Sequence, residues 1–183
     1  MSKKVWIVLI ATLALSPASS GLAQLYRDSL PIPANEIYGS MLHYALEKDF
    51  KKLERTLLVA KPVVQAIDSK FGSDIESKMQ AGLAENSQEQ LIKTLQRLIS
   101  LDMKDLMAIG VAASMESQDK AKAKFKTAYL DYLLLSPYVQ AKSISADQKI
   151  RDILQEADTT AGSPADFRKR ADDIEHEMMT ALP

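Results

Sequence analysis

The chain has 183 residues, of which 46% are hydrophobic and 26% are charged, with a net charge of -1 and no cysteine. A chain of this length and composition can bury one hydrophobic core. The absence of cysteine excludes disulfide scaffolds, thiol catalysis, thiolate metal sites and covalently attached haem. The isoelectric point of about 6.1 gives no indication of a nucleic-acid partner, because such proteins normally carry a basic surface.

The N-terminus has the three-part pattern of a secretory signal peptide. Lys3 and Lys4 are followed by an apolar run over residues 5–15 and then by small residues. The apolar run is shorter than the roughly 20 residues that span a bilayer, so we expect cleavage and no stable membrane span. Ala23 is the expected cleavage position, with Ser20 as the alternative. The mature protein is therefore predicted to be periplasmic or secreted, with a net charge of -3.

The rest of the sequence predicts helix almost throughout. Apolar residues recur at intervals of three and four, the spacing of one helix face, and no run has the alternation of a strand. The first helix is expected to begin at an N-cap, Asn35, and to be broken at Pro62. Ser87 and Gln90 have the spacing of a capping box. The helix that they open carries a wide apolar arc, and we expect it to be central.

Later helices are predicted from the same signals. One is expected from about Asp119 to Leu135 with a stop at Pro137, another from Ser145, and the last from Ser163 with proline at its first position. The fold class is therefore all-α, a helical bundle. The predicted divisions are a signal peptide (1–23), an N-terminal loop (24–34) and a single helical domain (35–183).

The helical domain matches itself at a constant offset of 75 residues. Between residues 50–75 and 125–150, eight of 26 positions are identical, whereas random composition gives roughly two. We therefore predict two tandem units, about 35–110 and about 111–183, packed with pseudo-twofold symmetry. The alternative is that two amphipathic stretches align through their shared periodicity.

Two of the matched pairs suggest a structural role. Pro62 matches Pro137, and Gln65 matches Gln140. The prolines are expected to end helices, and the glutamines to bond backbone groups freed at each break.

The best metal-ligand candidates are His43 and Glu47, whose i, i+4 spacing can bring two ligands to one metal. They supply half a site at most, and a solvated acidic surface explains the same pattern. His176, the only other histidine, points away from the inward stripe of its helix. No cofactor is therefore predicted; the alternative is a bundle that holds haem or a transition metal for electron transfer or metal handling.

Asp49 and Asp102 occupy positions that the apolar pattern turns inward. A buried carboxylate must find a partner or change its pKa. Tyr129 and Tyr132 are candidates to donate hydrogen bonds to such a cluster. Lys124 aligns with Asp49 at the repeat offset, which suggests that the two side chains pair across the pseudo-twofold axis. The alternative is that both carboxylates reach water at a helix end or at the rim of the bundle.

No catalytic motif is present, whether a serine triad with elbow glycines, a phosphate-binding loop or HExxH. The sequence therefore predicts a protein that acts by binding, as an accessory or adaptor subunit or as a small-ligand carrier in the cell envelope. The nearly all-apolar segment 128–135 is either central or a partner-binding face. The expected partner is a protein or a small ligand, and self-association into a homo-oligomer is compatible with this reading.

Overall fold

The computed structural model describes residues 17–182, and in this part of the chain it contains eight helices and no strand. The all-α prediction is therefore confirmed. The basic start and the apolar run of the predicted signal peptide lie outside the described residues. The helices are α1 (Pro17–Asp28), α2 (Ala34–Leu46), α3 (Phe50–Phe71), α4 (Ile75–Ala84), α5 (Gln88–Ala113), α6 (Gln118–Lys142), α7 (Ile144–Thr159) and α8 (Pro164–Ala181).

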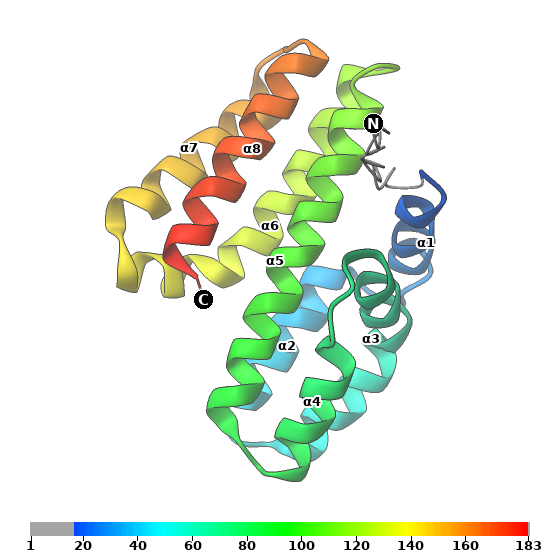
Figure 1. Ribbon diagram of the computed structural model, residues 1–183, viewed down its shortest axis with the longest axis vertical. Coiled ribbons are helices and arrows are strands. Elements are labelled where there is room, and N and C mark those ends of the chain that lie inside the picture. The colour runs from blue at the N-terminus through cyan, green and yellow to red at the C-terminus, as the bar shows by residue number, and fades with distance from the viewer. Residues whose placement is uncertain (1–16, 183) are drawn as a thin grey trace, which may run out of the picture.

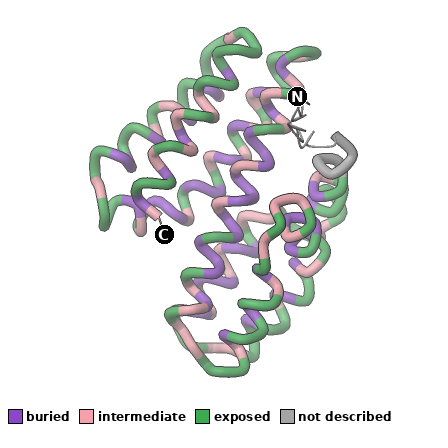
Figure 2. Tube along the Cα trace, in the orientation of Figure 1, coloured by how far each residue is buried: buried purple, intermediate pink, exposed green. Residues whose placement is uncertain are grey.

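The long helices α5 and α6 pack against each other and form the centre of the bundle (Figure 1). α7 and α8 lie on one side of this pair, and α1 to α4 on the other. Buried positions follow α5 along most of its length (Figure 2), because it contacts α2, α3, α4, α6 and α8. The predicted central position of the helix that begins at Ser87 is confirmed.

The apolar segment of α6 is also central. Ala128, Tyr132 and Leu135 are fully buried, whereas Leu130 and Leu133 are 41% and 38% exposed. The segment therefore serves mainly to fill the core, and two of its leucines face outward.

The prediction of a loop over residues 24–34 is wrong for its first part, since α1 continues to Asp28. Gln24 donates a hydrogen bond to Asp28 one turn later (2.6 Å), and the buried Arg27 ties the helix to the bundle. Pro31 and Pro33 then prevent the helix from continuing. Tertiary contacts thus keep a short segment helical that is marginal by itself.

The predicted first helix is two helices. Lys48 has a left-handed backbone with φ of 56°, and the next residue, Asp49, caps α3 by accepting a hydrogen bond from the Lys52 backbone (3.2 Å). α2 also begins earlier than predicted, with Pro33 and not Asn35 at its N-cap. The break rotates α3 relative to α2, so the single apolar stripe on which Asp49 was placed does not exist.

Two serine caps are confirmed and a third is displaced. Ser87 caps α5, and Ser163 forms a capping box with Asp166 at the start of α8. α7 is capped by Ser143 and not by Ser145. Ser143 is also the C-cap residue of α6, so a single residue separates the two helices.

The prolines do not end helices. Pro62 lies inside α3 and Pro137 inside α6, and both are exposed. Each proline leaves the carbonyl four residues earlier without an amide partner, and the residues concerned, Leu58 and Leu133, are themselves exposed. Water can therefore satisfy these carbonyls, and the helices continue.

The matched glutamines do not repair the backbone at these prolines. Gln65 donates to the Glu76 side chain on α4 (2.9 Å), and Gln140 is exposed. The offset of 75 residues pairs α3, α4 and α5 with α6, α7 and α8; the pseudo-twofold relation between the units stays a prediction.

We predict that Pro62→Ala and Pro137→Ala each raise the free energy of unfolding by about 1–3 kcal/mol, because alanine restores a helical hydrogen bond at a solvent-facing position. Urea unfolding followed by circular dichroism measures this. A loss of stability in either variant would contradict the reading that these prolines interrupt continuous helices.

Candidate functional site

The predicted metal ligands lie on the surface of the bundle. His43 and Glu47 are both exposed at the end of α2, and His176 is exposed on α8. Over residues 17–182, no group of three or more ligating side chains is placed to hold a metal ion.

The predicted inward polar residues lie in separate places. Asp102 is fully buried, whereas Asp49 is a partly exposed cap of α3 paired with Lys52 (2.9 Å), so its predicted pairing with Lys124 is wrong. Tyr132 is buried but donates to Asp147 (2.8 Å). The Tyr129 hydroxyl accepts a hydrogen bond from Gln155 (3.1 Å). Only Asp102 therefore belongs to the charged centre of the bundle.

That centre is a buried cluster contributed by five helices. We name it the central charged cluster; its members are Arg27 from α1, Tyr38 from α2, Lys70 from α3, Asp102 and Asp105 from α5, and Asp131 from α6.

Ion pairs connect α1 and α3 to α5 within this cluster. Arg27 Nε donates to Asp102 Oδ1 (2.8 Å), and Arg27 Nη2 bonds both that oxygen and Asp105 Oδ2 (2.6 Å to the latter). Lys70 Nζ bonds Asp105 Oδ1. The two cationic side chains are about 5% exposed and the carboxylates are fully buried. Buried pairs of this kind are costly to break, since the remaining partner becomes an uncompensated buried charge.

The other side of the cluster has polar atoms without hydrogen-bond partners in the described part of the chain. They are both carboxyl oxygens of Asp131, Oδ2 of Asp102, the Tyr38 hydroxyl and Nη1 of Arg27. Buried polar atoms are normally satisfied, so this group of unpartnered atoms between α1, α2, α5 and α6 is unusual for a bundle core.

Protonation of one carboxyl group is the simplest way to make the charges of this cluster cancel. Burial raises the pKa of Asp131 well above its usual range, and the nearby Asp102 carboxylate raises it further. Burial also raises the pKa of Asp102, although Arg27 opposes that shift. Burial raises the pKa of Tyr38 as well, so its hydroxyl stays neutral. One proton on the Asp102 and Asp131 pair then leaves two carboxylates for the two cations.

Sequence reasoning missed most of this cluster. Arg27 was assigned to a loop, and its burial depends on α1 being a packed helix. One signal was available: Asp131 interrupts the apolar segment 128–135 of α6, and an acidic residue within such a run must be exposed or specially bound.

One buried carboxylate, Asp147, lies outside the central charged cluster. Asp147, near the start of α7, accepts hydrogen bonds from Tyr132 (2.8 Å), Ser136 (2.6 Å) and Arg151 (3.0 Å). Although burial acts to raise the pKa of Asp147, these hydrogen bonds lower it overall. Asp147 is therefore buried as an ion, in contrast to Asp131.

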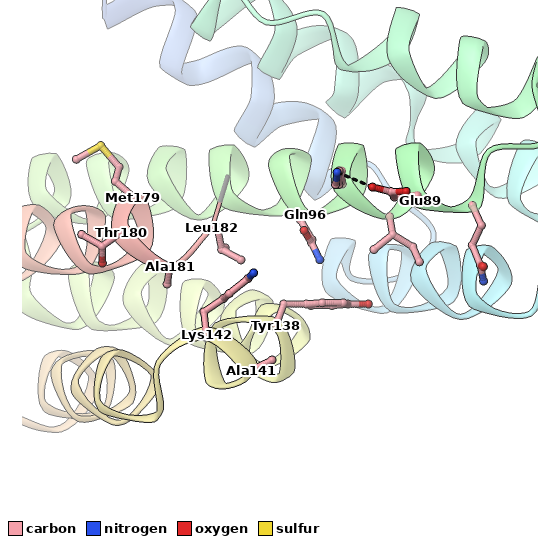
Figure 3. Close-up of a pocket in the computed structure, with 12 residues that line it drawn as sticks. Glu89, Gln96, Tyr138, Ala141, Lys142, Met179, Thr180, Ala181 and Leu182 are labelled. Atoms are coloured by element: carbon pink, nitrogen blue, oxygen red, sulfur yellow. Dashed lines mark hydrogen bonds and ion pairs between the residues drawn. The ribbon is translucent and has the colours of Figure 1, made fainter.

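The surface carries a groove of about 910 Å³ between α5, α6 and α8. Its apolar lining includes Ile92, Tyr138 and Leu182, and its polar lining includes Gln96 and Lys142. Figure 3 shows Tyr138 and Lys142 projecting from α6 on the side that faces Gln96 of α5. The groove is separate from the central charged cluster, since the two share no residue.

No protein family, curated protein or solved structure matches this chain.

We predict that Asp131→Asn changes how stability depends on pH. The pKa of Asp131 is raised in the folded chain, so its stabilising contribution is complete below the ordinary aspartate pKa and disappears as the pH rises through the folded pKa. Relative to the asparagine variant, the native protein should lose up to about 1.4 kcal/mol of unfolding free energy per pH unit for this one proton. Urea unfolding from pH 5 to pH 9 measures the difference, and a difference independent of pH would contradict the assignment.

Proposed function

We propose that this protein is an exported helical bundle that acts by binding, and that it carries a small ligand with an apolar body and one acidic group. The observation that carries the proposal is the groove between α5, α6 and α8. A concave site supports a carrier of a small molecule more directly than an adaptor that docks on a flat surface.

The size and lining of the groove suit such a ligand. Its volume of about 910 Å³ lies within the range of roughly 300–1,000 Å³ that is typical of small-molecule sites. Ile92, Met179 and Leu182 provide apolar contacts from α5 and the end of α8. These side chains would contact the apolar part of the ligand.

The charges of the groove favour an anionic group on the ligand. Lys93 is already paired with Glu89 (2.7 Å) at one edge. For Lys142, by contrast, no acidic partner lies within ion-pair distance among the residues described. Its ammonium group is therefore available to a carboxylate, and the Gln96 amide and Tyr138 hydroxyl lie in the same groove. Burial raises the pKa of Tyr138, so that hydroxyl remains a hydrogen-bond donor.

The test compares an acid with its uncharged analogue. We expect dodecanoate to bind the purified protein more tightly than dodecanol in isothermal titration calorimetry. Lys142→Gln should weaken dodecanoate binding about tenfold, the loss of one charge-assisted contact, and should leave dodecanol binding unchanged. Ile92→Asp should weaken both ligands, because it places a charge in the apolar wall.

The matched control is Lys126→Gln, an exposed lysine of α6 that does not line the groove. This variant should bind both ligands as the native protein does. No detectable binding of either ligand, or equal binding by the Lys142→Gln variant, would overturn the proposal.

The export part of the proposal is supported by the N-terminal sequence pattern. Within residues 17–182, no helix is sufficiently long and apolar to cross a membrane. The fold bears on the choice of cleavage position, because Ala23 is fully buried in the core. Cleavage after Ser20 keeps Ala23 in the mature chain, whereas cleavage after Ala23 removes this core contact of α1 and keeps only Arg27.

We therefore predict that the exported protein begins at Gly21. Intact-mass analysis and N-terminal sequencing of protein recovered from the periplasm or the medium distinguish this from a chain that begins at Gln24. A start at Gln24 would contradict the argument from Ala23, and an uncleaved chain retained in the cytoplasm would contradict export.

A further inference from the structure

We propose that Asp102 and Asp131 form a proton-binding site, and that one proton is taken up when α1 closes on the bundle. The proposal rests on the central charged cluster and is independent of the groove and its ligand. It makes α1 a latch that is closed at low pH and opens as the pH rises.

α1 is the part of the described bundle best placed to move. Of its side chains from Leu22 onward, only Ala23 and Arg27 are buried, while Leu25 is 62% exposed. The helix packs mainly against α3, and the loop that connects it to α2 contains Pro31 and Pro33. An element with so few buried apolar contacts opens more readily than the core, and Arg27 provides its main polar attachment.

The charges around the site require an additional positive charge when α1 is closed. Every ionisable group whose charge acts on the cluster enters the balance, including Asp28 and Lys124 at its edge. The carboxylates are Asp28, Asp102, Asp105 and Asp131, and the cations are Arg27, Lys70 and Lys124. If all of them are ionised, one negative charge is left in excess, and apart from Asp28 and Lys124 at the edge these groups are buried. A protein avoids this cost by binding a proton there.

The atoms that receive this proton are those without partners. Oδ2 of Asp102 and both oxygens of Asp131 are buried and unbonded, and so is the Tyr38 hydroxyl beside them. A proton on Asp131 makes that group a donor to Asp102, and Tyr38 can donate to the same carboxylate. A metal cation suits this place less well than a proton, since Arg27 is bonded to the other oxygen of Asp102.

The direction of the pH effect follows from this balance. When α1 lifts, water reaches Asp102 and Asp131, both groups ionise, and the proton is released. Low pH therefore favours the closed position and high pH favours the open one. For one proton, the ratio of open to closed chains rises about tenfold per pH unit between the ordinary aspartate pKa of the open state and the raised pKa of the closed site, and it levels off above the latter.

The distance between α1 and α5 tests the proposal in the full chain. Because the sequence has no native cysteine, nitroxide labels can be placed at Leu25→Cys on α1 and Arg97→Cys on α5, both exposed positions. Double electron–electron resonance should give one narrow distance distribution at pH 5. At pH 9 a second, broad component at longer distances should appear.

Two further substitutions in the labelled protein separate the proton site from general effects of pH. Asp131→Asn mimics the protonated group and should keep the distribution narrow at both pH values. Asp147→Asn is the matched control, a buried carboxylate of another cluster, and should leave the pH response intact. Urea unfolding of each variant confirms that it is folded, and the response of the otherwise native chain is decisive even if Asp131→Asn does not fold.

Three outcomes would overturn the proposal: an unchanged distribution between pH 5 and pH 9, an equal response in the Asp131→Asn variant, or loss of the response in the Asp147→Asn variant.

Discussion

The ion pairs of Arg27 with Asp102 and Asp105 are the interaction that decides where α1 lies on the bundle and how the charge at its centre is compensated. They join the first described helix to the central one across 75 or more residues of sequence, and Lys70 adds α3 to the same carboxylates. Burying these charges costs solvation, which only good geometry and charge balance recover. Direct hydrogen bonds between the charged groups provide the geometry. A proton on the Asp102 and Asp131 pair provides the charge balance.

The bundle has two distinct candidate sites, the central charged cluster and the groove. The central charged cluster is closed and holds helices together, whereas the groove between α5, α6 and α8 is open and lined largely by apolar side chains. Both regions use the long central pair α5 and α6. A ligand in the groove therefore contacts the same two helices that carry Asp102 and Asp131.

The candidate sites show where sequence reasoning succeeds and where it ends. The inward position of Asp102 was predictable, because it interrupts the apolar arc of one continuous helix. The place of Asp49 was not, because a left-handed residue at Lys48 splits the predicted helix and changes its rotation. Arg27 could not be identified, since its burial requires α1 to pack on α3. Lys142 joins Gln96 and Leu182 in the groove only through the packing of three helices.

By itself, the sequence determined the helical class, the central role of the helix that follows Ser87, and the serine caps at Ser87 and Ser163. These are local properties, set by apolar spacing and by side chains that bond the nearest backbone amides. The tertiary structure alone decided that Pro62 and Pro137 lie within helices and which carboxylates meet. The reason is physical. A proline is tolerated inside a helix where the carbonyl four residues earlier faces water, and a charge is tolerated in the core where distant helices supply its partners. Neither condition can be determined from the local sequence.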